Sequence, residues 1–126
     1  MSEQRKPRLL AFAGSLRQNS YNRHLAANAA RMAREAGAEV VEVNLRDYPL
    51  PMFDEDVEAQ GVPEKVRELK DLFATADGLL IASPEYNGSV TAVLKNLIDW
   101  VSRPDGQFGR AELFQGRKAA LFATSP

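Results

Sequence analysis

A polar loop at residues 14–22 combines the residue types that bind an anion where a strand gives way to a helix. Ser15 and Ser20 supply hydroxyl groups, and Arg17 carries a guanidinium that can make paired hydrogen bonds to phosphate. A helix that starts at Ser20, a good N-cap, would add free backbone N–H groups and a favourable dipole. The loop therefore predicts a phosphate site. A plain strand-to-helix turn, with Ser20 as the cap and Arg17 in solvent, explains the composition equally well.

The spacing within this loop limits which phosphate compound it suits. It opens on Gly14, which relieves crowding at a sharp turn, and it adds the short amide donor Asn22. It lacks the G-x-G-x-x-G spacing of dinucleotide sites and the G-K-S/T ending of the P-loop. NAD binding at this helix and ATP hydrolysis are therefore disfavoured. A phosphate monoester, such as that of flavin mononucleotide (FMN), fits better.

A second polar loop follows another apolar run and consists of Pro84, Glu85, Tyr86, Asn87 and Gly88. Pro84 fixes a backbone angle and Gly88 permits a turn. The pattern suits a rigid ledge that hydrogen-bonds the edge of a flat aromatic ligand, with Tyr86 or Asn87 in contact with it. Taken without the first loop, the residues favour a capped turn that starts a helix, with Tyr86 on the surface.

Apolar runs alternate with segments of helical periodicity, and this order predicts the fold class. Strands are expected at residues 8–13, 39–45, 78–83 and 117–124, and helices at 20–36, from Pro63 to Ala76, and at 90–102. Such alternation is typical of an α/β fold with a doubly wound parallel sheet and helices on both faces. Ligands of these sheets bind beyond the C-terminal strand ends, so both polar loops are expected at one end of the sheet.

Helical spacing also predicts which residues pack on the sheet. The first helix has an apolar stripe formed by Leu25, Ala29, Met32 and Ala36. The second has a stripe formed by Val66, Leu69, Phe73 and Ala76. The stripe of the third helix is wider, and residues 46–62, with the acidic run 54–56, are expected to form an irregular solvated loop.

Composition excludes several classes of function. The chain has 126 residues and a formal charge of -1, so its net charge does not favour binding to nucleic acid. It has no cysteine, which rules out disulfides, thiolate metal sites and cysteine nucleophiles. The single histidine, His24, is expected in a structural or solvent-facing role, and no metal site is predicted. No apolar run approaches the roughly 20 residues of a membrane helix, so no membrane partner and a cytoplasmic location are expected.

Several motifs together resemble the NADPH-dependent FMN reductase family, which includes quinone, azo-dye and chromate reductases of flavodoxin-like fold. They are residues 14–17 with Ser20 and Asn22, residues 83–89, residues 94–100, and the stretch 45–51. The resemblance runs from about Arg8 to Pro126. It implies a flavodoxin-like three-layer sandwich, FMN as cofactor and NADPH or NADH as electron donor.

The resemblance also implies roles for individual residues. The flavin phosphate would be held by Ser15, Arg17, Ser20, Tyr21 and Asn22. The isoalloxazine ring would be lined by Pro84, Glu85, Tyr86, Asn87 and Gly88, and Ser125 would begin a third flavin-contacting loop. No protein residue is expected to act as a catalytic base, because the flavin carries hydride to a quinone, azo compound, free flavin or metal ion. A homodimer or homotetramer is implied.

The sequence departs from the family at its C-terminal end. Residues 1–126 are expected to form a single flavodoxin-like domain that lacks the family's last helix, strand and helix. With strand order 2-1-3-4, the fourth strand becomes an exposed edge. Two alternatives to a reductase therefore stay open: a non-catalytic FMN- or phosphate-binding fragment, and an interaction module of the same fold.

Overall fold

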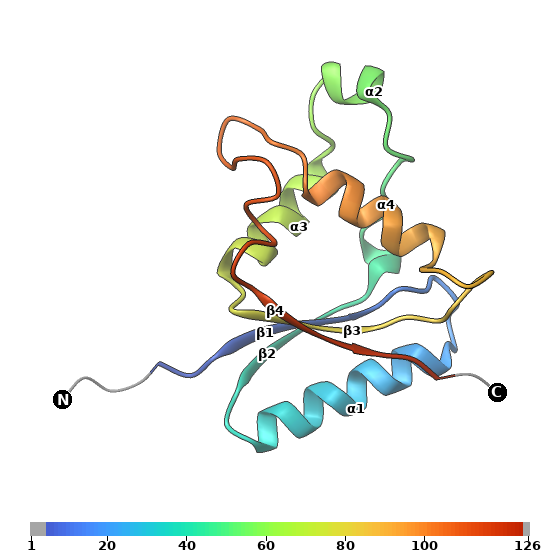
Figure 1. Ribbon diagram of the computed structural model, residues 1–126, viewed down its shortest axis with the longest axis vertical. Helices are drawn as coiled ribbons and strands as arrows, with labels where there is room; N and C mark the ends of the chain where they lie inside the picture. Colours follow the sequence, from blue (N-terminus) through green and yellow to red (C-terminus); the bar gives the residue numbers. More distant parts are fainter. Residues whose placement is uncertain (1–4, 125–126) are drawn as a thin grey trace.

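The computed structural model describes residues 5–124, which form a parallel sheet with helices on both faces (Figure 1). The elements are β1 (Arg8–Ala13), α1 (Tyr21–Glu35), β2 (Glu39–Val43), a 3-10 turn η1 (Leu45–Asp47), α2 (Glu55–Ala59), α3 (Glu64–Thr75), β3 (Gly78–Ala82), α4 (Ala92–Val101) and β4 (Lys118–Phe122). The strand order is β2-β1-β3-β4, and every neighbouring pair is parallel. α1 lies on one face, while α3 and α4 lie on the other. The predicted fold class and strand order are confirmed.

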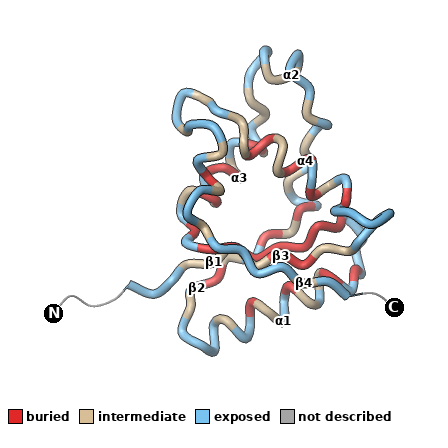
Figure 2. Tube along the Cα trace, viewed as in Figure 1, coloured by how far each residue is buried: buried red, intermediate tan, exposed pale blue. Residues whose placement is uncertain are grey.

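The main core lies on the α3–α4 face. Phe12 of β1 and Ile81 of β3 point to this face, where they pack with residues of both helices. The stripe predicted for the second helix is confirmed, because Val66, Leu69, Phe73 and Ala76 are all buried. Figure 2 shows this burial concentrated on the central strands and on the helix faces that cover them.

The stripe predicted for α1 is wrong. Met32 is 61% exposed, whereas Asn22, Ala26 and Ala30 are the buried residues of this helix. They meet a sheet face that also presents alanines, including Ala11. Small side chains on both sides let the helix lie close to the sheet, so the packing face is the small one rather than the most hydrophobic one.

The region expected to be an irregular loop contains a helix, so the residues described hold four α-helices rather than three. The acidic run itself starts α2: the Asp54 carboxylate accepts a hydrogen bond from the N–H of Asp56. Acidic residues at an N-cap and first turn stabilise a helix through its free N–H groups and its dipole. α2 buries none of its residues and projects away from the sheet (Figure 1).

A buried ion pair attaches the connection after α4 to α3. The Lys70 ammonium, only 1% exposed, lies 2.7 Å from Asp105 and donates a second bond of 2.7 Å to the carbonyl of Arg103. Asp105 also accepts from the N–H groups of Gln107 and Phe108. Burial alone would raise the pKa of Asp105, but these hydrogen bonds outweigh it and lower the pKa to about 2.

The edge strand β4 is exposed, as expected for the residues described. Its side chains from Lys118 to Leu121 are exposed, and Leu121 is 74% exposed. Within residues 5–124, β4 pairs only with β3, through a register that sets Ala82 opposite Phe122. The parallel register brings the end of β4 beside the end of β3, so the residues after both strands lie at the same edge of the sheet.

Replacing Asp105 by Asn should lower the free energy of unfolding by about 3 to 5 kcal/mol, because it leaves the Lys70 charge buried without its partner. Lys95→Ala breaks an exposed ion pair with Asp99 and serves as the control, with an expected loss below about 1 kcal/mol. Urea unfolding measures both. Because the folded pKa of Asp105 is depressed, its contribution is present above its ordinary value of 3.8 and is lost as pH falls toward about 2. Equal losses for both variants would contradict this assignment.

Candidate functional site

The two polar loops meet where the central strands β1 and β3 end. The N–H of Gly14 donates to the carbonyl of Ala82 at 2.8 Å. The Thr91 hydroxyl donates to the carbonyl of Gly14 at 2.7 Å and also caps α4 by accepting from Leu94. Since β1 leads away to β2 and β3 leads toward β4, this is the point where the strand order reverses. Ligands of open parallel sheets bind at such a point.

A pocket of about 360 Å³ lies there, and we call it the switch-point pocket. Its lining residues are Ser15, Arg17, Ser20, Tyr21, Asn22, Pro84, Glu85, Tyr86, Ala123 and Thr124. It therefore brings together the five residues predicted to hold a phosphate and three of those predicted to line a ring. A volume of this size accommodates a small organic ligand.

Two buried serines offer hydroxyl groups to this pocket. Ser15 Oγ accepts a hydrogen bond from the N–H of Arg17 at 3.2 Å, and Ser20 Oγ accepts from the N–H of Asn22 at 3.1 Å. Each oxygen thus acts as an acceptor toward the backbone, which leaves its O–H free to donate. Both side chains are fixed in place by these bonds and by burial.

The same loop offers further donors and a positive charge. Within residues 5–124, no hydrogen bond is made by the N–H of Leu16, Gln18, Asn19 or Tyr21, and Tyr21 is the first residue of α1. The Arg17 guanidinium makes no ion pair in that range of the chain and lines the pocket. No acidic residue occurs between positions 14 and 22. The arrangement suits an anion that accepts several hydrogen bonds.

Asn22 lines the pocket, but its amide is already engaged. Asn22 Nδ2 donates to the Thr124 carbonyl at 3.3 Å, and the N–H of Thr124 donates back to Asn22 Oδ1 at 3.2 Å. This reciprocal pair joins the first turn of α1 to the residue that follows β4. Asn22 therefore holds Thr124, a lining residue of the pocket, in position.

The second loop contains a tight turn. Tyr86 and Ser89 exchange backbone hydrogen bonds of 3.1 Å, and the two residues between them have positive φ, 55° at Asn87 and 78° at Gly88. An Asn-Gly pair with positive φ at both positions is typical of a two-residue hairpin turn. Asn87 and Gly88 form this turn and do not line the pocket, whereas Tyr86 lines it and is 55% exposed.

Ser125, His24 and the residues that follow β4 complete the comparison with the sequence predictions. Ser125 lies outside the described residues. Ala123 and Thr124 line the pocket and were not predicted from the sequence, although they follow a strand whose end lies at the same edge of the sheet. His24 is exposed and lines a different pocket. Among residues 5–124, no group of three His, Cys, Asp or Glu is placed to hold a metal ion, and no helix is long and apolar enough to span a membrane.

Comparison with known proteins identifies the family. The model of the family described as NADPH-dependent FMN reductase matches residues 7–126. The chain belongs to the NADPH-dependent FMN reductase family. Within it, a 2-hydroxy-1,4-benzoquinone reductase from Burkholderia sp and an NAD(P)H-dependent FMN reductase from Pseudomonas aeruginosa are each 38% identical over 119 residues, which is 94% of this chain.

Solved structures agree with this family assignment. The flavoenzyme NAD(P)H:(acceptor) oxidoreductase FerB from Paracoccus denitrificans superposes with a TM-score of 0.77 at 34% identity, over 95% of this chain and 62% of FerB. The apo form of the NADH:FMN oxidoreductase EMOB gives 0.65 at 26% identity, over 96% and 60%. The chain spans about 60% of the length of the curated relatives it matches.

The meeting point of the two loops requires glycine at position 14. A Cβ there would lie 2.7 Å from Ser83 Oγ, 3.1 Å from Ser83 Cβ and 3.2 Å from Leu94 Cβ. Gly14→Ala should therefore destabilise the chain by about 1 to 3 kcal/mol by overpacking. Adding Ser83→Gly removes the two Ser83 contacts and should recover most of the loss. Thermal unfolding of the single and double variants measures both, and a double variant as unstable as the sum of its parts would refute the contact.

Proposed function

We propose that this chain is an FMN-dependent NAD(P)H oxidoreductase that passes electrons to quinones, azo compounds, free flavin or metal ions. The observation that carries this proposal is the donor set of the switch-point pocket, next to a rigid ledge at the carboxyl ends of β1 and β3. The names of the relatives support it, because they describe reductases of a benzoquinone and of FMN.

The donor set fits the phosphate of FMN. A phosphate monoester carries close to two negative charges and accepts hydrogen bonds at three oxygens. The O–H groups of Ser15 and Ser20, the N–H of Tyr21 and the Arg17 guanidinium supply neutral donors and one cation. No carboxylate belongs to this loop, so nothing in it repels the anion.

The ledge fits the ring of a flavin. Pro84, Glu85 and Tyr86 form one wall and Thr124 another, and both walls are held by the hydrogen bonds described above. The Glu85 carboxylate is not aimed freely into the pocket, because Oε1 accepts from the N–H of Gly88. Ser125, which follows Thr124 directly, belongs to this proposal as a further ring contact.

When bound, FMN supplies the redox chemistry, taking hydride from NAD(P)H and giving electrons to an acceptor. The chain's own contribution is to fix the phosphate with Ser15, Ser20 and Arg17 and to orient the ring against residues 84–86. Among the described residues that line the switch-point pocket there is no histidine or cysteine, so Ser15 and Ser20 have no histidine base beside them to make either one a nucleophile. Catalysis therefore depends on orientation and on the donors around the ring.

We further infer that copies of the chain associate as a homodimer or homotetramer with the flavin near the contact. Four large apolar or aromatic side chains are exposed around the loops of this end of the sheet: Leu16, Tyr21, Tyr86 and Val90. Burying them between copies would remove apolar surface from water and would narrow access to the pocket. Sedimentation of the FMN-loaded chain measures the number of copies.

Arg17→Ala should weaken FMN binding by about ten- to a hundredfold, because it removes a charge-assisted contact to phosphate. Riboflavin, which has no phosphate, should lose almost no affinity. Arg67→Ala, an equal change of charge at an exposed position of α3, is the control and should leave both affinities unchanged. Quenching of flavin fluorescence measures them. Equal losses for FMN and riboflavin would contradict a phosphate role.

The FMN-loaded chain should oxidise NADPH when a quinone such as menadione is present. The loss of NADPH absorbance measures the reaction. At an FMN concentration that saturates the unmodified chain but not the Arg17→Ala variant, the variant should have little activity. A chain that binds FMN but never oxidises NADPH would instead be a flavin-binding module.

A further inference from the structure

The turn that carries Tyr86 contains the one asparagine of the chain that is followed by glycine. Asparagine is thermally labile, because the backbone nitrogen of the next residue can attack its side-chain carbonyl carbon. A glycine in that next position has no side chain to shield the nitrogen, and it leaves the backbone free to bring the nitrogen within reach. The pair Asn87–Gly88 therefore has the composition of a deamidation site.

Both residues of this pair are open to water. Asn87 and Gly88 are exposed. Apart from the chain neighbours of Gly88, a Cβ built there would have one described atom within 4 Å, which is Glu85 Oε1 at 4.0 Å. Within residues 5–124, the side-chain amide of Asn87 makes no hydrogen bond. The amide is therefore free to turn toward the Gly88 nitrogen, and water can reach the product of the attack.

The other five asparagines lack this combination of features. They are Asn19, Asn22, Asn28, Asn44 and Asn96. Three of them lie inside α1 and α4, where helical hydrogen bonds fix the peptide groups. The other two are followed by Ser20 and Leu45, which are buried and restrict the backbone movement that the attack requires. Position 87 is therefore the favoured site in the folded chain.

The Glu85 carboxylate restrains the reacting nitrogen. Its Oε1 accepts a hydrogen bond from the N–H of Gly88. The attack requires this nitrogen to lose its proton, and a charge-assisted hydrogen bond that holds the proton opposes that loss. A carboxylate is far too weak a base to take the proton itself, and its negative charge disfavours the amide anion. Glu85 is thus placed to slow the reaction.

We propose that Asn87 is a site of spontaneous deamidation and that Glu85 sets its rate. The Gly88 nitrogen loses its proton and forms a bond to Asn87 Cγ. The bond from Cγ to Nδ2 breaks, and Nδ2 leaves as ammonia with that proton. Water then opens the five-membered succinimide at either of its carbonyl carbons. The products are aspartate and isoaspartate, in which the chain runs through Cβ.

Isoaspartate at position 87 would change a wall of the switch-point pocket. The turn closes because Tyr86 and Ser89 exchange backbone hydrogen bonds across two residues of positive φ. An extra backbone carbon breaks that spacing, and a new carboxylate adds a second negative charge to the turn. Tyr86, which lines the pocket, then loses its fixed place. This consequence for FMN rests on the proposed function, whereas the deamidation itself does not.

Incubation of the folded chain in mildly alkaline buffer, followed by peptide mapping with mass spectrometry, tests the proposal. Deamidation adds about 1 Da, because an NH2 group becomes OH, and it should appear at Asn87 before any other asparagine. Glu85→Ala should raise the rate at Asn87 by at least about threefold, because the hydrogen bond to the Gly88 nitrogen is lost.

Glu112→Ala is the matched control for this variant. It removes the same kind of contact, a carboxylate that accepts from a glycine N–H, because Glu112 Oε1 accepts from Gly109 at 3.0 Å. That turn contains no asparagine, so the rate at Asn87 should stay unchanged. Earlier deamidation at another asparagine, no gain of mass at Asn87, or an unchanged rate in the Glu85→Ala variant would overturn the proposal.

The FMN affinity of the chain before and after deamidation tests the consequence for the pocket. It should fall by at least about threefold on deamidation, because the wall that holds Tyr86 is lost. Asn87→Asp adds the charge without the extra backbone carbon and should lose less, since aspartate also tolerates positive φ. An unchanged affinity would refute this consequence. A fresh chain that binds no FMN would refute the proposed function, and the mass measurement would still decide the deamidation.

Discussion

The site depends on one close crossing of the backbone, where Gly14 lies against Ala82 and Ser83. The hydrogen bond from Gly14 to Ala82 extends the β1–β3 pairing by one residue beyond the strands, and Thr91 then fixes the Gly14 carbonyl from the start of α4. Two loops far apart in the sequence thereby form one pocket. A side chain at position 14 would separate them, because it would collide with Ser83 and Leu94.

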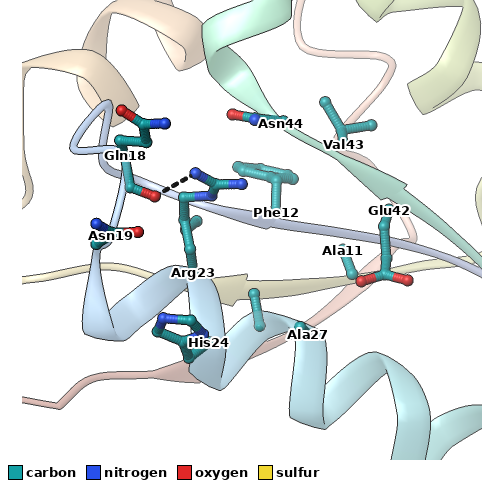
Figure 3. Close-up of a pocket in the computed structure, with 12 residues that line it drawn as sticks. Ala11, Phe12, Gln18, Asn19, Arg23, His24, Ala27, Glu42, Val43 and Asn44 are labelled. Carbon is teal, nitrogen blue, oxygen red and sulfur yellow. Dashed lines mark hydrogen bonds between the residues drawn. The ribbon is translucent and has the colours of Figure 1, made fainter.

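The first turn of α1 lines two pockets. Ser20 caps α1 and keeps its hydroxyl proton for a ligand, while Asn22 uses its amide to hold Thr124 at the end of β4. The next residues, Arg23 and His24, line a second pocket beside β2 together with Ala11 and Ala27 (Figure 3). One short stretch of sequence thus contributes side chains to two separate pockets.

Much of the fold was predictable because the strands are continuous apolar runs and the α3 stripe is strongly periodic. The packing face of α1 was not, because hydrophobic spacing ranks Met32 above Ala26 and Ala30, whereas the narrow gap to the sheet admits only alanine. α2 was not predicted, because it buries no residues and its acidic side chains are typical of a solvated loop. Its local signal is the Asp54 N-cap.

Most residues that line the switch-point pocket were predictable from their types, but their hydrogen-bond partners were not. Ser15, Ser20 and Arg17 lie where loop chemistry placed them, in one pocket. Asn87 and Gly88, which stay predicted ring contacts, have positive φ angles and make the turn that carries Tyr86. These structural roles depend on backbone angles and on partners far away in the sequence, such as Thr124 for Asn22, and a local sequence pattern does not encode them.

A crystal structure of the chain grown with FMN tests the central claim most directly. Phosphate density is expected within hydrogen-bond distance of the Ser15 and Ser20 hydroxyls and the N–H of Tyr21, with the ring against residues 84–86. Phosphate density anywhere else, or the switch-point pocket filled by protein side chains, would contradict it.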